Sequence, residues 1–333
     1  MIKRLLALCV VCLMLPVVAA CATTPRITET AVTADGMVGI LFRPATSAKP
    51  IPAVLVLGGS EGGLNAAVTA EARLIAQHGM AALQLAYFGT GHLPESLQLI
   101  PVEYFTGAVA WLQTQKGIDP AKIAILGTSV GGEAALLIAA YDMDVHAVVA
   151  AVPSGIVWQG IGPWGMTKPE SSFSWRGYAL PDLPYRTGEP GGTFDRYASG
   201  LNSLPRHRDA IMPLARINAP IMMICGGRDV VWPSCPMVAL AAQQLKAAGF
   251  AHPVAVFAFP HAGHAVFGPP VMTVRPGDTE FADLGSLGGT ALANNAARAV
   301  AWPAFFAFLD RAFGTGSDVA ARPLARMARS LPP

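Results

Sequence analysis

Short apolar runs alternate with longer amphipathic stretches along most of the chain. The apolar runs predict eight strands, at residues 27–32, 38–42, 54–57, 81–85, 123–126, 147–151, 221–224 and 254–259. The stretches between them predict helices at residues 66–78, 101–115, 132–141, 236–248 and 291–313. Strands that are apolar throughout are typical of sheets covered on both faces. The pattern therefore predicts an α/β fold with a mainly parallel eight-stranded sheet and helices on both faces.

The first twenty residues follow a different pattern. Lys3 and Arg4 precede an apolar run over residues 5–20, which ends in small residues directly before Cys21. A charged start, a run too short to span a bilayer and a small-residue end are typical of a secretory signal. With the cysteine, the leader resembles that of bacterial lipoproteins, which implies cleavage, acylation of Cys21 and, with Ala22 next, an outer-membrane anchor facing the periplasm. The alternatives are an ordinary signal peptide with an incidental cysteine and an uncleaved anchor.

Removing the leader changes the charge and the cysteine count. Two cations and no acids leave with it, so the formal net charge falls from +2 to 0. A formal charge of zero gives no indication of a nucleic-acid partner, and we expect none. Apart from Cys21, only Cys225 and Cys235 then remain. They either pair in an oxidising envelope or lie separately as small buried residues, since a spacing of ten residues does not set their geometry.

A serine flanked by glycines follows the predicted strand at 123–126. Residues 127–131, GTSVG, lie directly between this strand and a helix-forming run. A strand–turn–helix of this kind is too tight for side chains on its flanks, and it lifts the serine hydroxyl to the carboxyl edge of the sheet. The alternative is a glycine-rich turn in which Ser129 only caps the helix. We predict Ser129 to be a nucleophile.

An acid and a histidine follow two later strands. Asp229 comes just after the strand at 221–224, and His264 follows the strand at 254–259. The order Ser, Asp, His is the one that α/β-hydrolases use. A histidine activates a serine hydroxyl by taking its proton, and a buried carboxylate orients that histidine. We therefore predict a catalytic triad of Ser129, Asp229 and His264, a chemistry for which we expect neither a cofactor nor a metal.

Two histidines follow the last predicted strand, and backbone amides near the serine are candidates for binding an oxyanion. His261 also follows the last strand, but we prefer His264 because the glycine before it lets the loop turn toward the serine. The oxyanion that forms during acyl transfer needs backbone N–H donors. The first expected donor is the N–H of Val130, directly after the nucleophile. The second is expected from the glycine-rich loop after the third predicted strand, where the amides of Ser60 and Glu61 are both candidates.

One segment interrupts the alternation of strands and helices. Residues 155–216 are rich in Pro, Gly and aromatic side chains and are too long for a plain connection. We expect them to form a lid over the active site. Its residues Trp158 and Trp175 would line an apolar substrate pocket together with Tyr87 and Trp232. The alternative is a surface excursion whose aromatic side chains pack within their own loop.

The chain also resembles a known family in five short segments. These are Leu85-Ala86-Tyr87-Phe88-Gly89, Leu93-Pro94, Ile100-Pro101-Val102-Glu103-Tyr104-Phe105, Gly127-Thr128-Ser129-Val130-Gly131-Gly132-Glu133 and Trp232-Pro233-Ser234. Together they resemble the carboxyl-terminal catalytic domain of acyl-CoA thioester hydrolases and bile acid-CoA:amino acid N-acyltransferases, a relative of dienelactone hydrolase. The resemblance runs from about Pro52 to about Leu309.

This resemblance implies an α/β-hydrolase fold with a serine or cysteine nucleophile at position 129, completed by Asp229 and His264. Serine at this position is typical of the thioesterases, and cysteine is commoner in the N-acyltransferases. Family members from animals carry an amino-terminal β-sandwich domain, for which the stretch between Cys21 and Pro52 is too short.

The predicted organisation is a leader at 1–20, a linker with the first strands at 21–50, a catalytic domain at 51–313 and a tail at 314–333. We expect a serine hydrolase that cleaves small or medium carboxylic esters, or thioesters, through an acyl-enzyme. The alternatives are acyl-CoA thioester hydrolysis, acyl transfer to amino acids, and an acyl-binding lipoprotein without turnover. The expected partners are a small-molecule substrate and, through the lipid anchor, a membrane; no oligomeric state is predicted.

Overall fold

An eight-stranded sheet forms the centre of the protein, in a computed structural model that describes residues 25–162, 169–185, 192–273 and 278–315. The strand order is β1-β2-β4-β3-β6-β7-β10-β11. The pairs β1–β2 and β2–β4 are antiparallel and the others are parallel, which confirms the predicted fold class. The strands are β1 (Ile27–Val32), β2 (Val38–Pro44), β3 (Ile51–Leu57), β4 (Ala81–Ala86), β6 (Ile118–Thr128), β7 (Ala147–Ala151), β10 (Ile221–Gly226) and β11 (Val254–Phe259).

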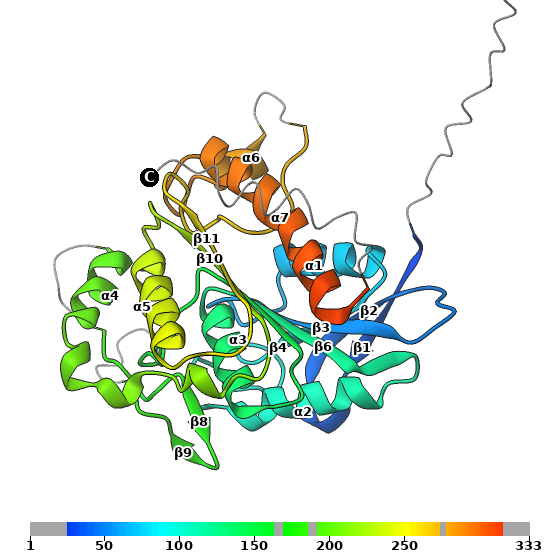
Figure 1. Cartoon of the computed structure of the whole chain (residues 1–333), viewed down its shortest axis with the longest axis horizontal. Helices are drawn as coiled ribbons and strands as arrows, with labels where there is room; N and C mark the ends of the chain where they lie inside the picture. Colours follow the sequence, from blue (N-terminus) through cyan, green and yellow to red (C-terminus); the bar gives the residue numbers. More distant parts are fainter. Residues whose placement is uncertain (1–24, 163–168, 186–191, 274–277, 316–333) are drawn as a thin grey trace, which may run out of the picture.

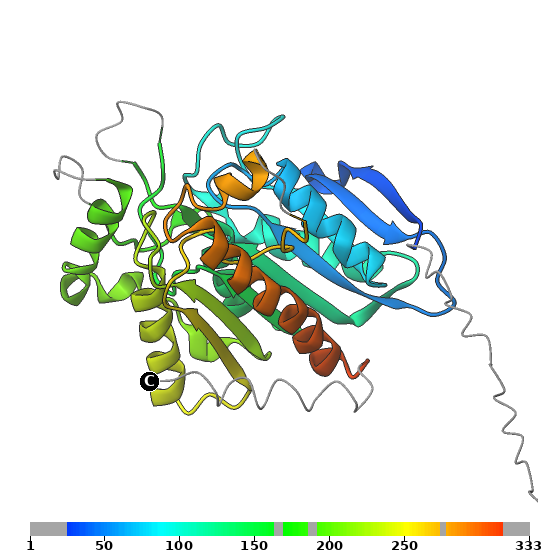
Figure 2. The ribbon, with the colours of Figure 1, turned by 90° about the horizontal axis from the view of Figure 1, so that it is seen from above.

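Helices cover both faces of this sheet (Figures 1 and 2). One face packs against α2 (Val102–Thr114), α3 (Val130–Tyr141) and α5 (Ser234–Ala247). The other face packs against α1 (Ala66–Gln77) and α7 (Ala291–Phe313), which Figure 2 shows crossing in front of the strands. Two separate apolar cores result, one on each side of the sheet. The central strands are buried because both of their faces are covered, as their continuous apolar sequences predict.

The last strand departs from this expectation. Although β11 is as apolar in sequence as the central strands, its residues alternate between exposed and half-buried, and Val256 is 45% exposed. The strand lies at the edge of the sheet, beside β10 alone. Apolar sequence therefore predicted the strand but not its burial.

The segment at 155–216 forms a small substructure of its own. Its described residues include β8 (Phe173–Trp175), β9 (Tyr178–Ala179), α4 (Thr193–Leu201) and three short 3-10 turns, while residues 163–168 and 186–191 lie outside the description. Strand β5 (Ile100–Pro101), which precedes α2, pairs with β8 and joins the segment to the main domain in a three-stranded sheet. These short elements and α6 (Thr279–Asp283) were not predicted, because each is shorter than the stretches in which periodicity is recognised.

Across the described parts of the chain, no helix combines the length and the apolar character that crossing a bilayer requires. The predicted leader at 1–20, the proposed acylation site Cys21 and nearly all of the tail at 314–333 lie outside the described residues.

Candidate active site

The predicted nucleophile lies in a strained turn between β6 and α3. Ser129 has φ 59° and ψ −124°, a left-handed backbone conformation that side-chain-bearing residues adopt rarely and mostly at functional sites. The turn is also crowded. A Cβ atom on Gly127 would lie 1.9 Å from the carbonyl oxygen of Gly131, and one on Gly131 would lie 2.2 Å from that of Gly58. Both glycines are therefore required for the turn, as the sequence pattern predicted.

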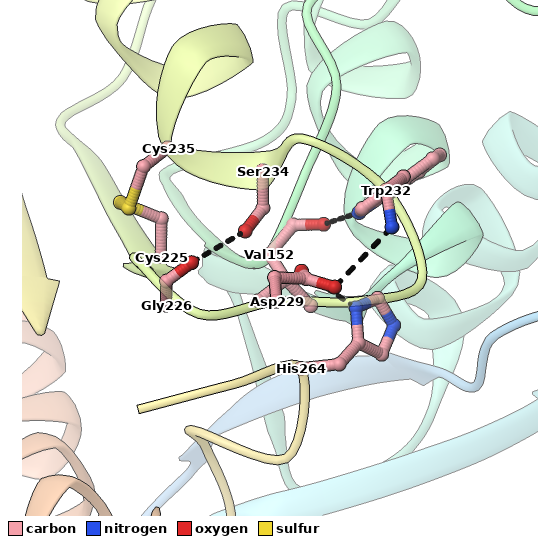
Figure 3. Close-up of a disulfide and its surroundings, with 8 residues drawn as sticks. All are labelled: Val152, Cys225, Gly226, Asp229, Trp232, Ser234, Cys235 and His264. Atoms are coloured by element: carbon pink, nitrogen blue, oxygen red, sulfur yellow. Dashed lines mark hydrogen bonds and ion pairs between the residues drawn. A yellow bond between two sulfur atoms is a disulfide. The ribbon is translucent and has the colours of Figure 1, made fainter. Parts of the chain in front are cut away.

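His264 and Asp229 form a buried pair. The His264 Nδ1 atom lies 2.8 Å from Asp229 Oδ2, and the two residues are only 8% and 5% exposed (Figure 3). The other carboxylate oxygen, Oδ1, accepts hydrogen bonds from the N–H groups of Val231 at 2.9 Å and Trp232 at 3.2 Å. These bonds provide partners for a carboxylate oxygen that is buried away from water. His261, the rival histidine, is exposed. With Nδ1 occupied by Asp229, the His264 Nε2 atom is the one left for a serine proton.

A short chain of contacts connects the serine turn to this pair. The Ser129 N–H donates to the carbonyl of Ala151, the last residue of β7. The carbonyl of the next residue, Val152, accepts from the indole Nε1 of Trp232 at 3.0 Å. The Trp232 ring in turn lies edge-on to His264, with ring centroids 6.2 Å apart. Loops after β6, β7, β10 and β11 thus converge at the carboxyl edge of the sheet.

The glycine-rich loop after β3 lies against the nucleophile. A Cβ atom on Gly59 would lie 3.2 Å from the Cβ of Ser129. The Gly59 N–H donates to Glu61 Oε1 at 2.9 Å, so this amide is already occupied. The candidates for the second oxyanion donor thus stay Ser60 and Glu61, both exposed on this loop. Val130 is the first residue of α3, and the N–H of a first helical residue has no acceptor within its helix.

Tyr87 supports this loop from below and does not line an open pocket. It is fully buried, and its hydroxyl lies 2.7 Å from the carbonyl oxygen of Gly58 and 2.8 Å from that of Gly59. Burial raises the pKa of Tyr87 well above its ordinary value, so the phenol keeps its proton and remains a donor. The prediction that it is a pocket residue is therefore wrong for this structure.

The three predicted pocket tryptophans have different positions. Trp175 packs edge-on against Tyr141, the last residue of α3, with ring centroids 4.8 Å apart. Because Tyr141 is the twelfth residue of the helix that follows Ser129, about 18 Å of helix separates the two, and Trp175 is not a pocket residue. Trp158 and Trp232 are near the site but almost completely buried. Their side chains pack inside the wall of the site and do not form the exposed surface of a pocket.

Tyr197 of α4, one of the aromatic residues of the inserted segment, connects these two tryptophans. Its ring lies edge-on to Trp158 at 4.8 Å and to Trp232 at 5.5 Å between centroids. An aromatic row therefore runs from the inserted segment to His264. A cavity of about 590 Å³ opens beside it, lined by Gly192, Phe194, Asp195, Arg228, Asp229, Val230, Gly288 and Gly289. The position of α4 next to Asp229 follows from tertiary packing, and no local signal indicated it.

Glu133, one turn into α3, is the buried carboxyl closest in sequence to the nucleophile. Its Oε1 atom accepts the N–H of Trp158 at 3.0 Å, which attaches the inserted segment to the serine turn. Burial raises the pKa of Glu133 to about 8, although this hydrogen bond acts in the opposite direction. The side chain is therefore mostly neutral at pH 7, and it adds little negative charge to the interior behind the serine turn.

Asn294 of α7 holds the loop that carries the histidine. It is fully buried, and its Oδ1 atom accepts the N–H of Gly263, directly before His264, at 2.6 Å. Its Nδ2 atom donates to the carbonyl oxygens of Leu284 and Gly288. The His264 N–H donates to the carbonyl of Leu287, within the same loop. An asparagine in the first turns of a helix carries no sequence signal for this role.

The two remaining cysteines are joined by a disulfide. Cys225 lies near the end of β10 and Cys235 in the first turn of α5 (Figure 3). The sequence left open whether they pair or lie separately as small buried residues, and the structure selects the pair. No group of side chains that could hold a metal ion occurs within the described ranges.

Several known proteins are similar to this chain. Residues 100–315 match the family described as BAAT / acyl-CoA thioester hydrolase C terminal. Acyl-coenzyme A thioesterase 6 of Mus musculus is 28% identical over 242 residues, which cover 71% of this chain and 54% of that protein. Acyl-coenzyme A amino acid N-acyltransferase 2 of Mus musculus is 30% identical over 276 residues, which cover 79% and 60%. The chain thus spans between half and two thirds of the length of these relatives.

Solved structures support the fold. A putative dienelactone hydrolase from Klebsiella pneumoniae superposes with a TM-score of 0.53 at 18% identity, covering 86% of this chain and 99% of that one. An α/β-hydrolase from a Medee basin deep-sea metagenome library gives a TM-score of 0.51 at 16% identity, covering 87% and 98%. Because the family match extends over more than half of the chain and includes Ser129, Asp229 and His264, the chain belongs to the BAAT / acyl-CoA thioester hydrolase C-terminal family, on an α/β-hydrolase fold.

Proposed function

We propose that the protein is a serine hydrolase that cleaves carboxylic esters or thioesters through an acyl-enzyme. The observation that supports this best is the buried His264–Asp229 hydrogen bond at the same sheet edge as the strained Ser129 turn. A protein that only bound acyl compounds would have no need for a strained serine together with a buried ionisable pair. The named relatives, thioesterases and N-acyltransferases, also act on acyl groups.

Acylation starts when the Ser129 hydroxyl attacks the acyl carbonyl carbon. His264 accepts the hydroxyl proton at Nε2, and Asp229 keeps the Nδ1–H in place and stabilises the imidazolium that forms. The N–H of Val130 and that of Ser60 or Glu61 hold the oxyanion of the tetrahedral intermediate. His264 then returns the proton to the leaving alcohol or thiol. Deacylation repeats the steps with water as the nucleophile.

The proposed substrates are small or medium oxygen esters rather than CoA thioesters. Acyl-CoA is a cytoplasmic metabolite, whereas the lipobox at Cys21 predicts export to the cell envelope. The Cys225–Cys235 disulfide supports this address, because disulfides persist mainly in oxidising compartments. Of the eight residues around the cavity beside Asp229, only Arg228 is basic, and it is accompanied by Asp195. Binding the phosphates of CoA calls for more positive charge than this.

Two measurements test the nucleophile. Ser129→Ala should lower kcat by about a million-fold while leaving the circular dichroism spectrum unchanged, since removing a triad member costs that much in a serine hydrolase. A fluorophosphonate probe should label the wild type at Ser129 and fail to label the variant. Labelling at another serine, or undiminished turnover by Ser129→Ala, would contradict the proposal that Ser129 is the nucleophile.

A substrate series tests the leaving group. The kcat/KM values for p-nitrophenyl esters and for CoA thioesters of matched acyl length should favour the esters. A thioester preference of tenfold or more would show that the family activity has been kept. Because one relative is named as an amino acid N-acyltransferase, the same assays should include glycine and taurine as acceptors. Conjugated product in place of free acid would favour acyl transfer.

A further inference from the structure

The Cys225–Cys235 disulfide closes the loop that carries Asp229. Cys225 is the penultimate residue of β10, pairs with Ala258 of β11 and is buried. Cys235 is the second residue of α5. Between them lie residues 226–234, here called the acid loop, with Asp229 near the middle. Figure 3 shows the disulfide joining the two ends of this loop, with the His264–Asp229 pair away from it, near the middle of the loop.

Hydrogen bonds within the acid loop orient the Asp229 carboxylate. Its Oδ1 atom accepts from the N–H groups of Val231 and Trp232, two and three residues further along the same loop. This turn directs the other oxygen, Oδ2, toward His264. The direction of the carboxylate therefore depends on the backbone conformation of the loop, and a change in loop shape moves the atom that holds the imidazole.

The noncovalent links between the two ends of the acid loop are weak. The Ser234 hydroxyl lies 3.4 Å from the carbonyl oxygen of Gly226, near the limit for a hydrogen bond. Trp232 is held by its indole N–H at the carbonyl of Val152, which belongs to the neighbouring loop after β7. The N–H groups of Gly227 and Arg228 donate to the carbonyls of Phe259 and Ala262, which holds the first half of the loop, and the disulfide is the covalent connection between the end of β10 and the start of α5.

We infer that this disulfide is a positioning device for Asp229, so that the oxidised protein is the active form and reduction lowers turnover. The inference rests on the proposed function. Opening the S–S bond frees the start of α5 from β10, lets the acid loop change its turn and weakens the orientation of His264. Since a misplacement of about 1 Å at a catalytic group costs on the order of a hundredfold, a partial loosening should cost about tenfold in kcat/KM.

The test uses full-length protein and a water-soluble trialkylphosphine as reductant. One phosphine and one water convert the disulfide into two thiols and a phosphine oxide; the two sulfurs gain two electrons and two protons, and phosphorus is oxidised. A phosphine is preferable to a thiol reductant, because thiols cleave p-nitrophenyl esters. Alkylation and mass measurement confirm that Cys225 and Cys235 are reduced, and Ser129→Ala with the same reductant supplies the blank.

We expect kcat/KM on a p-nitrophenyl ester to fall about tenfold on reduction and to recover on reoxidation. The variant Cys225→Ser/Cys235→Ser should have the lowered value with or without phosphine, measured well below its Tm. If oxidised wild type lacks Ser129-dependent turnover, the proposed function fails. If turnover is present but unchanged after confirmed reduction, only the positioning inference fails, and the disulfide contributes stability alone.

A double-mutant cycle shows whether the effect passes through Asp229. In the Asp229→Asn background, removing the disulfide should change kcat by less than twofold, because the carboxylate that it positions is already absent. A further tenfold loss there would overturn the inference. Should the double cysteine variant not fold, the phosphine titration of Asp229→Asn and wild type makes the same comparison without any cysteine substitution.

Discussion

Ser129 combines an unfavourable backbone conformation with a position at the start of a helix. A left-handed conformation at a residue with a side chain costs on the order of 1–3 kcal/mol, and it persists because the packing of Gly127 and Gly131 leaves no alternative. The strained turn places the Ser129 hydroxyl at the carboxyl edge of the sheet, with the N–H of Val130 beside it. The proposed nucleophile and one proposed oxyanion donor thus belong to a single turn.

At the same scale, the two histidines should differ sharply in effect. His264→Ala should lower kcat by about a million-fold, as Ser129→Ala does, because the residues of a triad act as a unit. Asp229→Asn should cost about ten thousandfold. His261→Ala should change kcat little, since His261 is exposed while His264 is the partner of Asp229. Steady-state kinetics on one ester checks all three variants. The assignment of the two histidines is reversed if kcat is lost in His261→Ala and retained in His264→Ala.

Glu133 should make stability depend on pH. Its pKa is raised by burial to about 8, from 4.5. Below pH 4.5 it is protonated in the folded and unfolded states alike. Between these values only the unfolded state ionises, so rising pH favours unfolding by about 1.4 kcal/mol per unit. Above pH 8 Glu133 ionises in both states, and its contribution to the stability of the folded state is fully lost.

Glu133→Gln should remove this dependence, because an amide oxygen can still accept the Trp158 N–H and does not ionise. Urea unfolding at pH 4.5, 6 and 8 should show the variant gaining stability over wild type as the pH rises. The exposed Glu95→Gln controls for loss of one acidic group. A constant difference between Glu133→Gln and wild type across this range would contradict the prediction.

At the scale of elements, the site depends on loops that other elements hold in place. Tyr87, at the end of β4, supports the loop after β3, and Glu133 of α3 holds the inserted segment at Trp158. Asn294 of α7 holds the histidine loop. The helices that cover the sheet therefore also position the catalytic loops, since each loop end has a partner in an element that is distant in sequence.

The first turns of α7 offer a matched pair of variants. Asn294 binds Gly263, Leu284 and Gly288 around His264, whereas the adjacent Asn295 binds only the backbone of Val271. Asn294→Ala should lower kcat/KM tenfold or more, because the histidine loop loses its support. Asn295→Ala should leave kcat/KM within about threefold.

Measuring the unfolding free energy of each asparagine variant distinguishes an effect on the position of His264 from a general loss of stability. Asn294→Ala removes buried hydrogen bonds and Asn295→Ala part-buried ones, and each change should cost about 1–3 kcal/mol. If the two variants lose equal stability but differ in kcat/KM, Asn294 acts through His264. Equal losses of activity would instead assign Asn294 a structural role only.

For the whole molecule, we expect the predicted lipid anchor to determine where the protein works. Cys21→Ser should move the protein out of the membrane fraction, because acylation of the mature amino terminus requires the thiol. Ser129→Ala, which leaves the lipobox intact, should remain in that fraction. Fractionation followed by mass measurement of the amino terminus checks the outcome. A wild-type protein recovered in the soluble fraction with an unmodified amino terminus would show that the leader is an ordinary signal peptide.

Much of the fold could be predicted from sequence. All eight strands of the large sheet and its five covering helices lie within a few residues of their predicted bounds, and the serine turn has the expected form. These features depend on neighbouring residues: an apolar run is buried as a strand, and glycines permit a turn that a Cβ atom would block. The candidate triad follows from the same local patterns, because the ends of parallel strands meet at one edge.

Only the tertiary structure decided how the site is supported. It pairs Cys225 with Cys235, places Tyr87 beneath the glycine-rich loop and puts Trp175 at the far end of α3. It also brings Asn294 to the histidine loop. Each of these contacts joins residues whose separation in space depends on how elements pack, and a side chain's type alone does not state its partner. Sequence thus determined which groups meet at the sheet edge, and packing determined what holds them there.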